Sequence, residues 1–170
     1  MEKANYHYGG TTKEKEWGHN VVDGLYVDLV NNNHFPIDIK SYLRKQDCDK
    51  YNKFKTKREI ALEIIDTSLN NSINGMVCCD AWYYSEYLVK EIKYRGLNYM
   101  IGIRTTLKIS MGRNKRISAA DYVKNLSKED FKVHRLKNGN YYLHNKVVSI
   151  RGEGKSMLLV SFKENDNEIK

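Results

Sequence analysis

Residues 76–105 read MVCCDAWYYSEYLVKEIKYRGLNYMIGIRT, and this stretch decides the fold. It opens with a short apolar run, residues 76–79, which ends abruptly in Asp80 as a buried strand does. Apolar residues then recur at helical spacing: Leu88, Val89 and Ile92. Gly96 is a helix stop signal, and a second apolar run follows over residues 98–105. The alternation predicts two parallel strands joined by a helix.

Two segments upstream predict an antiparallel hairpin. Residues 19–30 (HNVVDGLYVDLV) and 35–43 (FPIDIKSYL) are rich in β-branched and aromatic residues, and an Asn cluster lies between them. Alternation with a period of two predicts that a set of side chains shares one face of the second strand: Phe35, Ile37, Ile39 and Ser41.

A helix is expected to follow the charged connector after the hairpin. Thr56 and Glu59 have the spacing of a capping box, and Asn70 and Asn71 end the pattern. The apolar face of this helix is predicted to contain Ile60, Ala61, Ile64, Ile65 and Leu69.

The pattern changes after residue 105. Short β-rich segments over 131–136, 138–150 and 155–162 predict antiparallel strands, and Asn138-Gly139 is a hairpin turn signal. The fold class expected is therefore α/β, with a core over residues 1–105 and a β-rich region over 106–170.

Composition limits the classes of function. The chain has 170 residues with no apolar run long enough to span a membrane, and no secretory signal precedes the first strand. Cys48, Cys78 and Cys79 do not form a disulfide framework, so we expect buried thiols and a cytoplasmic protein.

The formal net charge of +8 favours a polyanionic partner such as DNA. Two basic clusters are candidate phosphate contacts, although solvated faces are an equally open interpretation. The first contains Lys55, Lys57 and Arg58, and the second Arg104, Lys108, Arg113, Lys115 and Arg116. The tyrosine pairs Tyr83-Tyr84 and Tyr141-Tyr142 either stack on unpaired bases or fill the core.

Asp80 is the strongest candidate for chemistry. The carboxyl end of a parallel strand is where α/β sheets bind ligands, and a carboxylate is a suitable oxygen ligand for Mg²⁺. The alternative is that Asp80 terminates the strand or caps a helix. Asp28 is a possible second ligand if its face turns toward Asp80.

Several segments together resemble the insertion-sequence DDE transposases, which have a ribonuclease-H-like catalytic core. The resemblance is carried by WGHNVVDGLYVD, FPIDIKSYLRK, FKTKREIALEIID and, most specifically, the stretch that contains DAWY. It implies a mixed sheet with helices, an incomplete ribonuclease-H-like core and an antiparallel β insertion. It also implies that Asp80 is the second of three carboxylates that bind two Mg²⁺ ions.

The implied activity is DNA transposition, in which strands are cut at element ends and joined to target DNA. In the family, the first catalytic Asp lies upstream of the part that the start of this chain resembles. The family's final catalytic Glu lies downstream of the β insertion. We therefore expect a truncated, inactive fragment. The alternatives are a non-catalytic module that binds DNA or interferes with a full-length transposase, and a remnant that folds poorly.

Overall fold

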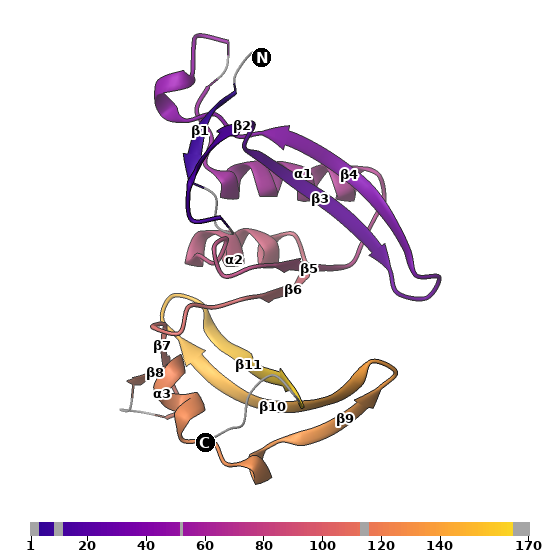
Figure 1. The fold of residues 1–170 in the computed structure, drawn as a ribbon, viewed down its shortest axis with the longest axis vertical. Helices are drawn as coiled ribbons and strands as arrows, with labels where there is room; N and C mark the ends of the chain where they lie inside the picture. The colour runs from indigo at the N-terminus through magenta and orange to yellow at the C-terminus, as the bar shows by residue number, and fades with distance from the viewer. Residues whose placement is uncertain (1–3, 9–11, 52, 113–115, 165–170) are drawn as a thin grey trace. The chain divides into compact units, whose positions relative to one another are not determined.

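The chain folds into two units that are described separately. A computed structural model describes residues 4–8, 12–51, 53–112 and 116–164. The first unit comprises Met1–Cys79 and Tyr87–Ile101, and the second comprises Asp80–Glu86 and Gly102–Lys170. Figure 1 shows both units as a mixture of helices and separate sheets, so the predicted α/β class is confirmed. The ribonuclease-H-like arrangement and the boundary at residue 105 stay predictions.

The first unit begins with two antiparallel hairpins. Strands β1 (Asn5–Tyr8) and β2 (Lys15–Gly18) form one pair, and β3 (Val21–Asp28) and β4 (Asn33–Ser41) form the other. The second hairpin is the one predicted from the sequence. A short 3₁₀ turn, η1 (Lys45–Asp47), follows it.

A β-bulge in β4 overturns the predicted alternation. Gly24 pairs with Asp38, but Leu25 pairs with Pro36, so Ile37 is an extra residue without a partner. A bulge shifts the side-chain pattern by one residue, which places Phe35 and Ile39 on opposite faces rather than on one. The bulge lies next to Pro36, which has no N–H to donate to the ladder.

Helix α1 (Lys57–Asn70) packs against this hairpin. The predicted capping box is confirmed: Thr56 Oγ1 accepts a hydrogen bond from the Glu59 N–H at 3.2 Å, and the Thr56 N–H donates to Glu59 Oε2 at 2.7 Å. The residues buried on α1 are Ile60, Leu62 and Ile64. Leu62 was not expected on the apolar face. The helix contacts β3 and β4 and is also joined to the next helix through Asp66, so its buried surface is wider than one stripe.

Gly24→Ala is expected to destabilise the first unit. A Cβ atom at Gly24 would lie 2.3 Å from Ile64 Cγ2, so β3 and α1 would have to separate. We expect the free energy of unfolding to fall by about 1–3 kcal/mol, measured by urea denaturation. Gly75→Ala is the control, because nothing lies within 4 Å of a Cβ there. Equal losses in the two variants would contradict this packing.

The predicted order of strand, helix and strand in residues 76–105 is confirmed, but the second strand ends at Ile101 rather than Thr105, and both strands are half-exposed rather than buried. Strands β5 (Met76–Cys79) and β6 (Asn98–Ile101) pair in parallel, and α2 (Glu86–Tyr94) connects them. The predicted inward residues of α2, Leu88, Val89 and Ile92, are all buried. Gly96 has a φ of 71°, and the Leu97 N–H donates to the Ile92 carbonyl, which closes the helix as expected.

Two features of this region were not anticipated. Cys78 is exposed and Cys79 half-buried, so the expectation of buried thiols is wrong. The β5–β6 pair has no further strand among the described residues, so the outer edge of each strand is unpaired. Arg95 at the end of α2 donates to both oxygens of Asp66 on α1, at 2.6 and 3.0 Å, and so ties the two helices together.

The described residues of the second unit form one antiparallel sheet. The β-rich character predicted after residue 105 is confirmed. The order of strands is β11-β10-β7-β8, and β9 pairs with the far end of β10 (Figure 1). The strands are β7 (Lys108–Ser110), β8 (Arg116–Ser118), β9 (Lys132–Leu136), β10 (Gly139–Ile150) and β11 (Gly154–Lys163). A short helix, α3 (Ala119–Lys124), and a 3₁₀ turn, η2 (Lys128–Asp130), lie between β8 and β9.

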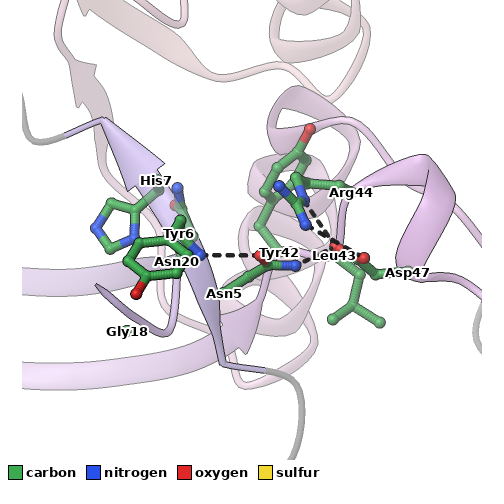
Figure 2. A pocket seen from close by; sticks show the side chains of 9 residues that line it. All are labelled: Asn5, Tyr6, His7, Gly18, Asn20, Tyr42, Leu43, Arg44 and Asp47. Atoms are coloured by element: carbon green, nitrogen blue, oxygen red, sulfur yellow. Dashed lines mark hydrogen bonds and ion pairs between the residues drawn. The ribbon is translucent and has the colours of Figure 1, made fainter. Parts of the chain in front are cut away.

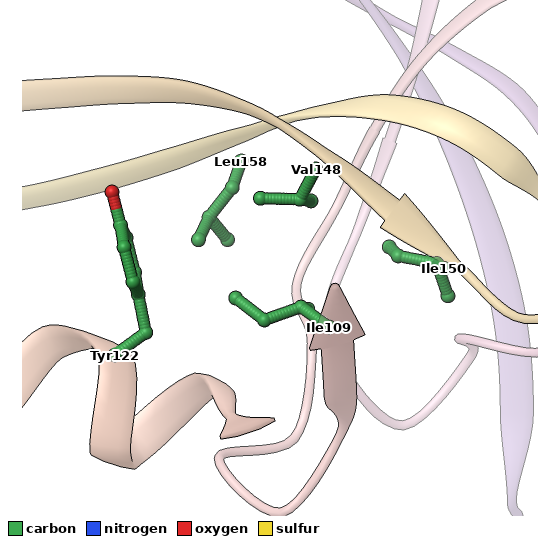
Figure 3. Packing of buried hydrophobic residues seen from close by; sticks show 5 residues of the cluster. All are labelled: Ile109, Tyr122, Val148, Ile150 and Leu158. Carbon is green, nitrogen blue, oxygen red and sulfur yellow. The ribbon is translucent and has the colours of Figure 1, made fainter. Parts of the chain in front are cut away.

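The core of the second unit lies between one face of this sheet and α3. Figure 3 shows Ile109 of β7 beneath the long strands and Tyr122 of α3 facing Leu158. Ile109 is fully buried, and Val148 and Ile150 of β10 complete the cluster. Tyr122 Oη also lies 2.7 Å from His144 Nε2, so its polar end has a partner.

Candidate functional site

Asp80 lies in a turn directly after β5, and its side chain is exposed. Its Oδ1 accepts a hydrogen bond from the Trp82 N–H at 2.8 Å, and its carbonyl oxygen accepts one from the Tyr83 N–H at 3.2 Å. These bonds form an Asx-type turn that fixes the direction of the carboxylate. Asp80 therefore ends the strand, and α2 begins only at Glu86.

The turn between β10 and β11 holds the segment that follows Asp80. Tyr84 Oη donates to Glu153 Oε2 at 2.9 Å, and Ser156 Oγ donates to Glu153 Oε1 at 2.5 Å. Both bonds are partly buried, and the first joins residues 69 positions apart in the sequence. Glu153 thus connects the segment 80–86 to the antiparallel sheet of the same unit.

Two glycines allow this close approach. A Cβ at Gly152 would lie 2.0 Å from the carboxylate of Glu86, and Gly152 has a φ of 80°. A Cβ at Gly102 would lie 2.7 Å from the Ala81 nitrogen. The backbone at Gly102 therefore lies directly against the start of the segment 80–86, and the backbone at Gly152 lies against the Glu86 side chain at its end.

Asp80 fits a divalent cation as a single oxygen ligand. Carboxylate oxygens suit Mg²⁺, and the turn leaves this carboxylate exposed. Over the described parts of the chain, no three His, Cys, Asp or Glu side chains gather into a metal site. Two-metal chemistry requires several converging carboxylates, so the described residues fit part of such a site.

Several other carboxylates of the second unit have structural roles. Those with hydrogen-bond donors are Asp121 with Ser118, Asp130 with Ser127, and Glu164 with Asn140 and Tyr142. The hydrogen bond from the Ser118 hydroxyl holds the pKa of Asp121 below its usual value. The Ser127 N–H does the same for the pKa of Asp130. These carboxylates stabilise helix and turn ends.

Asp28 closes the turn at the tip of the β3–β4 hairpin. Its Oδ1 accepts from the Val30 N–H at 2.9 Å and its Oδ2 from Asn31 Nδ2 at 2.7 Å. The Asn31 side chain is the main cause of a lowered pKa at Asp28. These hydrogen bonds within the turn explain the position of the Asp28 carboxylate, and a role of Asp28 as a metal ligand stays a prediction.

The basic residues predicted before α1 have partners in the first unit. Lys55 forms an ion pair with Glu63, and Lys57 Nζ lies 5.3 Å from the centroid of the Tyr42 ring. Arg58 is half-buried in the first turn of α1. Lys55 and Lys57 therefore also stabilise the fold, and their contact with DNA stays a prediction.

The second predicted cluster lies in the second unit. Arg104, Lys108 and Arg116 are exposed. Lys108 and Arg116 project from the same face of the β7–β8 pair, because Lys108 pairs with Ser118 and Arg116 with Ser110. Arg113 and Lys115 lie outside the described residues.

The two tyrosine pairs have different surroundings. Tyr142 is buried and stacks on Phe162 with centroids 4.8 Å apart, so it belongs to the core. Tyr84 holds Glu153 as described above. Tyr141 is half-buried on the opposite face of the sheet from Tyr142.

A cavity of about 240 Å³ lies in the first unit, between the β1–β2 hairpin and the end of β4. In Figure 2, Arg44 and Asp47 lie at one side of it and His7 at the other. Asp47 accepts from Arg44 Nε at 2.7 Å and from Asn5 Nδ2 at 2.9 Å. These bonds tie η1 to β1, and Asp80 does not line this cavity.

Sequence reasoning missed the residues that support Asp80. The bond between Tyr84 and Glu153 spans 69 positions and has no local signal. Gly152 did have a local signal, since the RGEG sequence at 151–154 is typical of a tight turn.

No helix in the described part of the chain is long and apolar enough to cross a membrane.

Comparison with known proteins gives the family. A family model described as DDE superfamily endonuclease matches residues 21–124, which include both hairpin strands β3 and β4, the β5–α2–β6 stretch and Asp80. Neither the curated proteins nor the solved structures contain a match to the chain. Enzymes of this superfamily use divalent metal ions and act on DNA. The match extends over more than half of the sequence, and the chain therefore belongs to the DDE superfamily endonucleases.

Proposed function

We propose that this chain derives from a DDE transposase of an insertion sequence and that Asp80 is one of its catalytic, metal-binding carboxylates. The observation that carries the proposal is the position of Asp80. Within the span of the family match, it is an exposed carboxylate at the carboxyl end of a parallel strand, fixed by its own turn. This is the position at which α/β sheets bind their ligands.

The proposed substrates are the DNA of element ends and target DNA. Mg²⁺ is the proposed ion, and when bound it would activate a water molecule or a strand 3′-hydroxyl for attack on a phosphodiester. Asp80 would contribute one oxygen ligand, and the hydrogen bond from the Trp82 N–H would hold its carboxylate in place. The cytoplasm of a cell is the proposed compartment.

We further propose that the 170-residue chain alone does not cut DNA. Two-metal chemistry requires converging carboxylates. Several carboxylates in the unit of Asp80 already stabilise caps and turns, and Asp28 closes a hairpin of the other unit. These partners support the view that the remaining ligands are supplied from elsewhere, for example by a full-length transposase.

A nicking assay tests this second proposal. Incubation of the chain with supercoiled plasmid and Mg²⁺ or Mn²⁺ is expected to leave the plasmid intact, as judged by the absence of the open circular form on a gel. Asp80→Ala serves as the matched control for contaminating nuclease. If the wild-type chain nicks the plasmid and Asp80→Ala abolishes the nicking, this chain assembles a complete site by itself.

The second candidate function is a non-catalytic module that binds DNA or interferes with a full-length transposase. The observation that favours it is the charge of +8, together with the exposed cations Arg104, Lys108 and Arg116. Coexpression with a transposase of the same element distinguishes the two. Inhibition of an active transposase that persists with Asp80→Asn indicates the module, whereas rescue of an inactive transposase that requires Asp80 indicates a catalytic contribution.

A further inference from the structure

The strands that the structure describes in the second unit carry no carboxylate. Every charged side chain on β7, β8, β9, β10 and β11 is basic, whereas the turns and helices between them contain acidic residues. The lysines and arginines on these strands are Lys108, Arg116, Lys132, Arg135, Lys146, Lys155 and Lys163. The sheet therefore presents positive charge that no neighbouring strand neutralises.

The strand register sorts these side chains between two faces. Val148, Leu158 and Ile109 point into the core, so their neighbours along each strand lie on the opposite face, here called the outer face. Lys155 pairs with Ser149, and Ser149 pairs with Ser110. This chain of pairs makes the outer face continuous from β11 across β10 to β7 and β8. The basic residues on it are Lys108, Arg116, Lys132, Lys155 and Lys163.

The cations lie at the two ends of the outer face. Lys155 lies at the end near β7 and β8, in the same row of paired residues as Arg116, with Ser149 and Ser110 between them. Lys163 pairs with Tyr141 at the other end, and Lys132 lies nearby on β9. Figure 1 shows β9 at the end of β10 that is remote from β7 and β8. Ser149 lies eight positions after Tyr141 on β10, which corresponds to about 27 Å of extended strand.

Exposed apolar side chains lie between the two groups of cations. Val147 is 55% exposed, Met157 66% and Leu159 46%. Val147 pairs directly with Met157, and Leu159 follows on the same face of β11. Such a group of exposed apolar side chains on one sheet face marks an interaction surface.

The occupant must therefore supply negative charge at both ends and apolar surface in between. Phosphates supply the charge, and base rings supply the apolar surface only when they are unpaired, since a duplex buries its base faces. A half-buried ring, Tyr141, lies next to Lys163 and offers a platform for stacking. We propose that the outer face binds single-stranded DNA. This inference rests on the proposed action on DNA, and it identifies the surface that holds an unpaired strand.

The test is fluorescence anisotropy of the whole chain with a labelled single-stranded oligonucleotide of mixed sequence, at about 50 and 200 mM salt. The triple variant Lys132→Ala, Lys155→Ala, Lys163→Ala is expected to bind about 10- to 100-fold more weakly at the lower salt. Its salt dependence should be shallower by about 2 in log–log slope, because each lost phosphate contact on a single strand removes about 0.7.

The matched control removes three lysines from other surfaces: Lys45→Ala, Lys50→Ala, Lys124→Ala. Lys124 lies on α3, on the core side of the sheet. Val147→Thr with Met157→Thr keeps residues that suit a strand, and it is expected to weaken binding of the single strand about tenfold and leave duplex binding unchanged. Circular dichroism verifies that each variant is folded.

The outcomes separate this inference from the proposed function. If the wild-type chain binds the single strand and the outer-face variant binds it as tightly as the control does, the inference is overturned and the action on DNA stands. Tighter binding of duplex than of single strand, with no effect of the apolar pair, also overturns it. Manganese binding at Asp80, described at the end of the Discussion, tests the proposed function independently of these lysines.

Discussion

Ile109→Ala is expected to lower the free energy of unfolding of the second unit by about 2–5 kcal/mol. Ile109 is fully buried at the centre of the cluster that joins the sheet to α3. Removing its outer carbons leaves a cavity, because the two long strands β10 and β11 pair along their whole length and cannot close around it. Net stabilities of domains are about 5–15 kcal/mol, so this is a large fraction.

Native-state hydrogen exchange is the measurement for this variant, because it reports on each unit separately. Amide protection in β10 and β11 should fall in Ile109→Ala, whereas protection in α1 should be preserved. Ile109→Val should cost only about 0.5–1.5 kcal/mol. Val133→Ala, at a side chain that is 50% exposed on β9, is the control. An equal loss of protection in α1 would contradict the division into two units.

Gly152→Ala is expected to release the segment that carries Asp80. Alanine at a φ of 80° costs about 1–2 kcal/mol by itself. The new methyl group would also occupy the position of the Glu86 carboxylate, so the Glu86 side chain at the end of the segment 80–86 would have to move away from the turn. We expect a total loss of about 1–3 kcal/mol in the stability of the second unit, because displacing the exposed Glu86 side chain adds at most about 1 kcal/mol to the backbone cost.

Gly154→Ala is a close control for that variant. Gly154 belongs to the same hairpin and has a φ of 86°, but nothing lies within 4 Å of a Cβ there. Gly154→Ala therefore has the energetic cost of an alanine at positive φ but no steric overlap with a neighbouring side chain. With Trp17→Phe as background, fluorescence of Trp82 reports directly on the segment 80–86, and it should change in Gly152→Ala but not in Gly154→Ala. The same response in both variants would show that Gly152 does not hold this segment.

The sequence predicted the elements of the first unit whose signals are local. The capping box of Thr56 and Glu59, the stop at Gly96 and the inward residues of α2 depend on contacts within one helix, and all were confirmed. The parallel pairing of β5 and β6 followed from the short helical crossover between them.

The errors arose where the pattern depends on distant partners. The bulge at Ile37 reversed the faces of β4, and nothing in its sequence distinguishes a bulge beside Pro36 from a regular strand. Leu62 is buried because α1 has neighbours on more than one side. Cys78 is exposed although its run is apolar, because the residues of β5 alternate between two faces: Met76 and Cys78 lie on the exposed face, and Val77 and Cys79 lie on the half-buried one.

Of the residues in the candidate site, Asp80 alone was predicted from the sequence. Asp80 followed from the abrupt end of an apolar run. Its support by Glu153 and Gly152 depends on a hairpin some 70 positions away: the sequence indicates the turn at 151–154, but not that this turn contacts the segment after Asp80. The outer face became visible only when the register joined lysines from separate strands.

Asp80 as a metal ligand is the central claim, and manganese titration followed by amide NMR tests it most directly. Mn²⁺ replaces Mg²⁺ at oxygen sites, and its unpaired electrons broaden the resonances of nearby nuclei even when binding is weak. We predict that the amides of Asp80, Ala81 and Trp82 broaden first, and that Asp80→Asn removes this broadening while the remaining spectrum is unchanged. Broadening that begins elsewhere, or that survives in Asp80→Asn, would contradict the account.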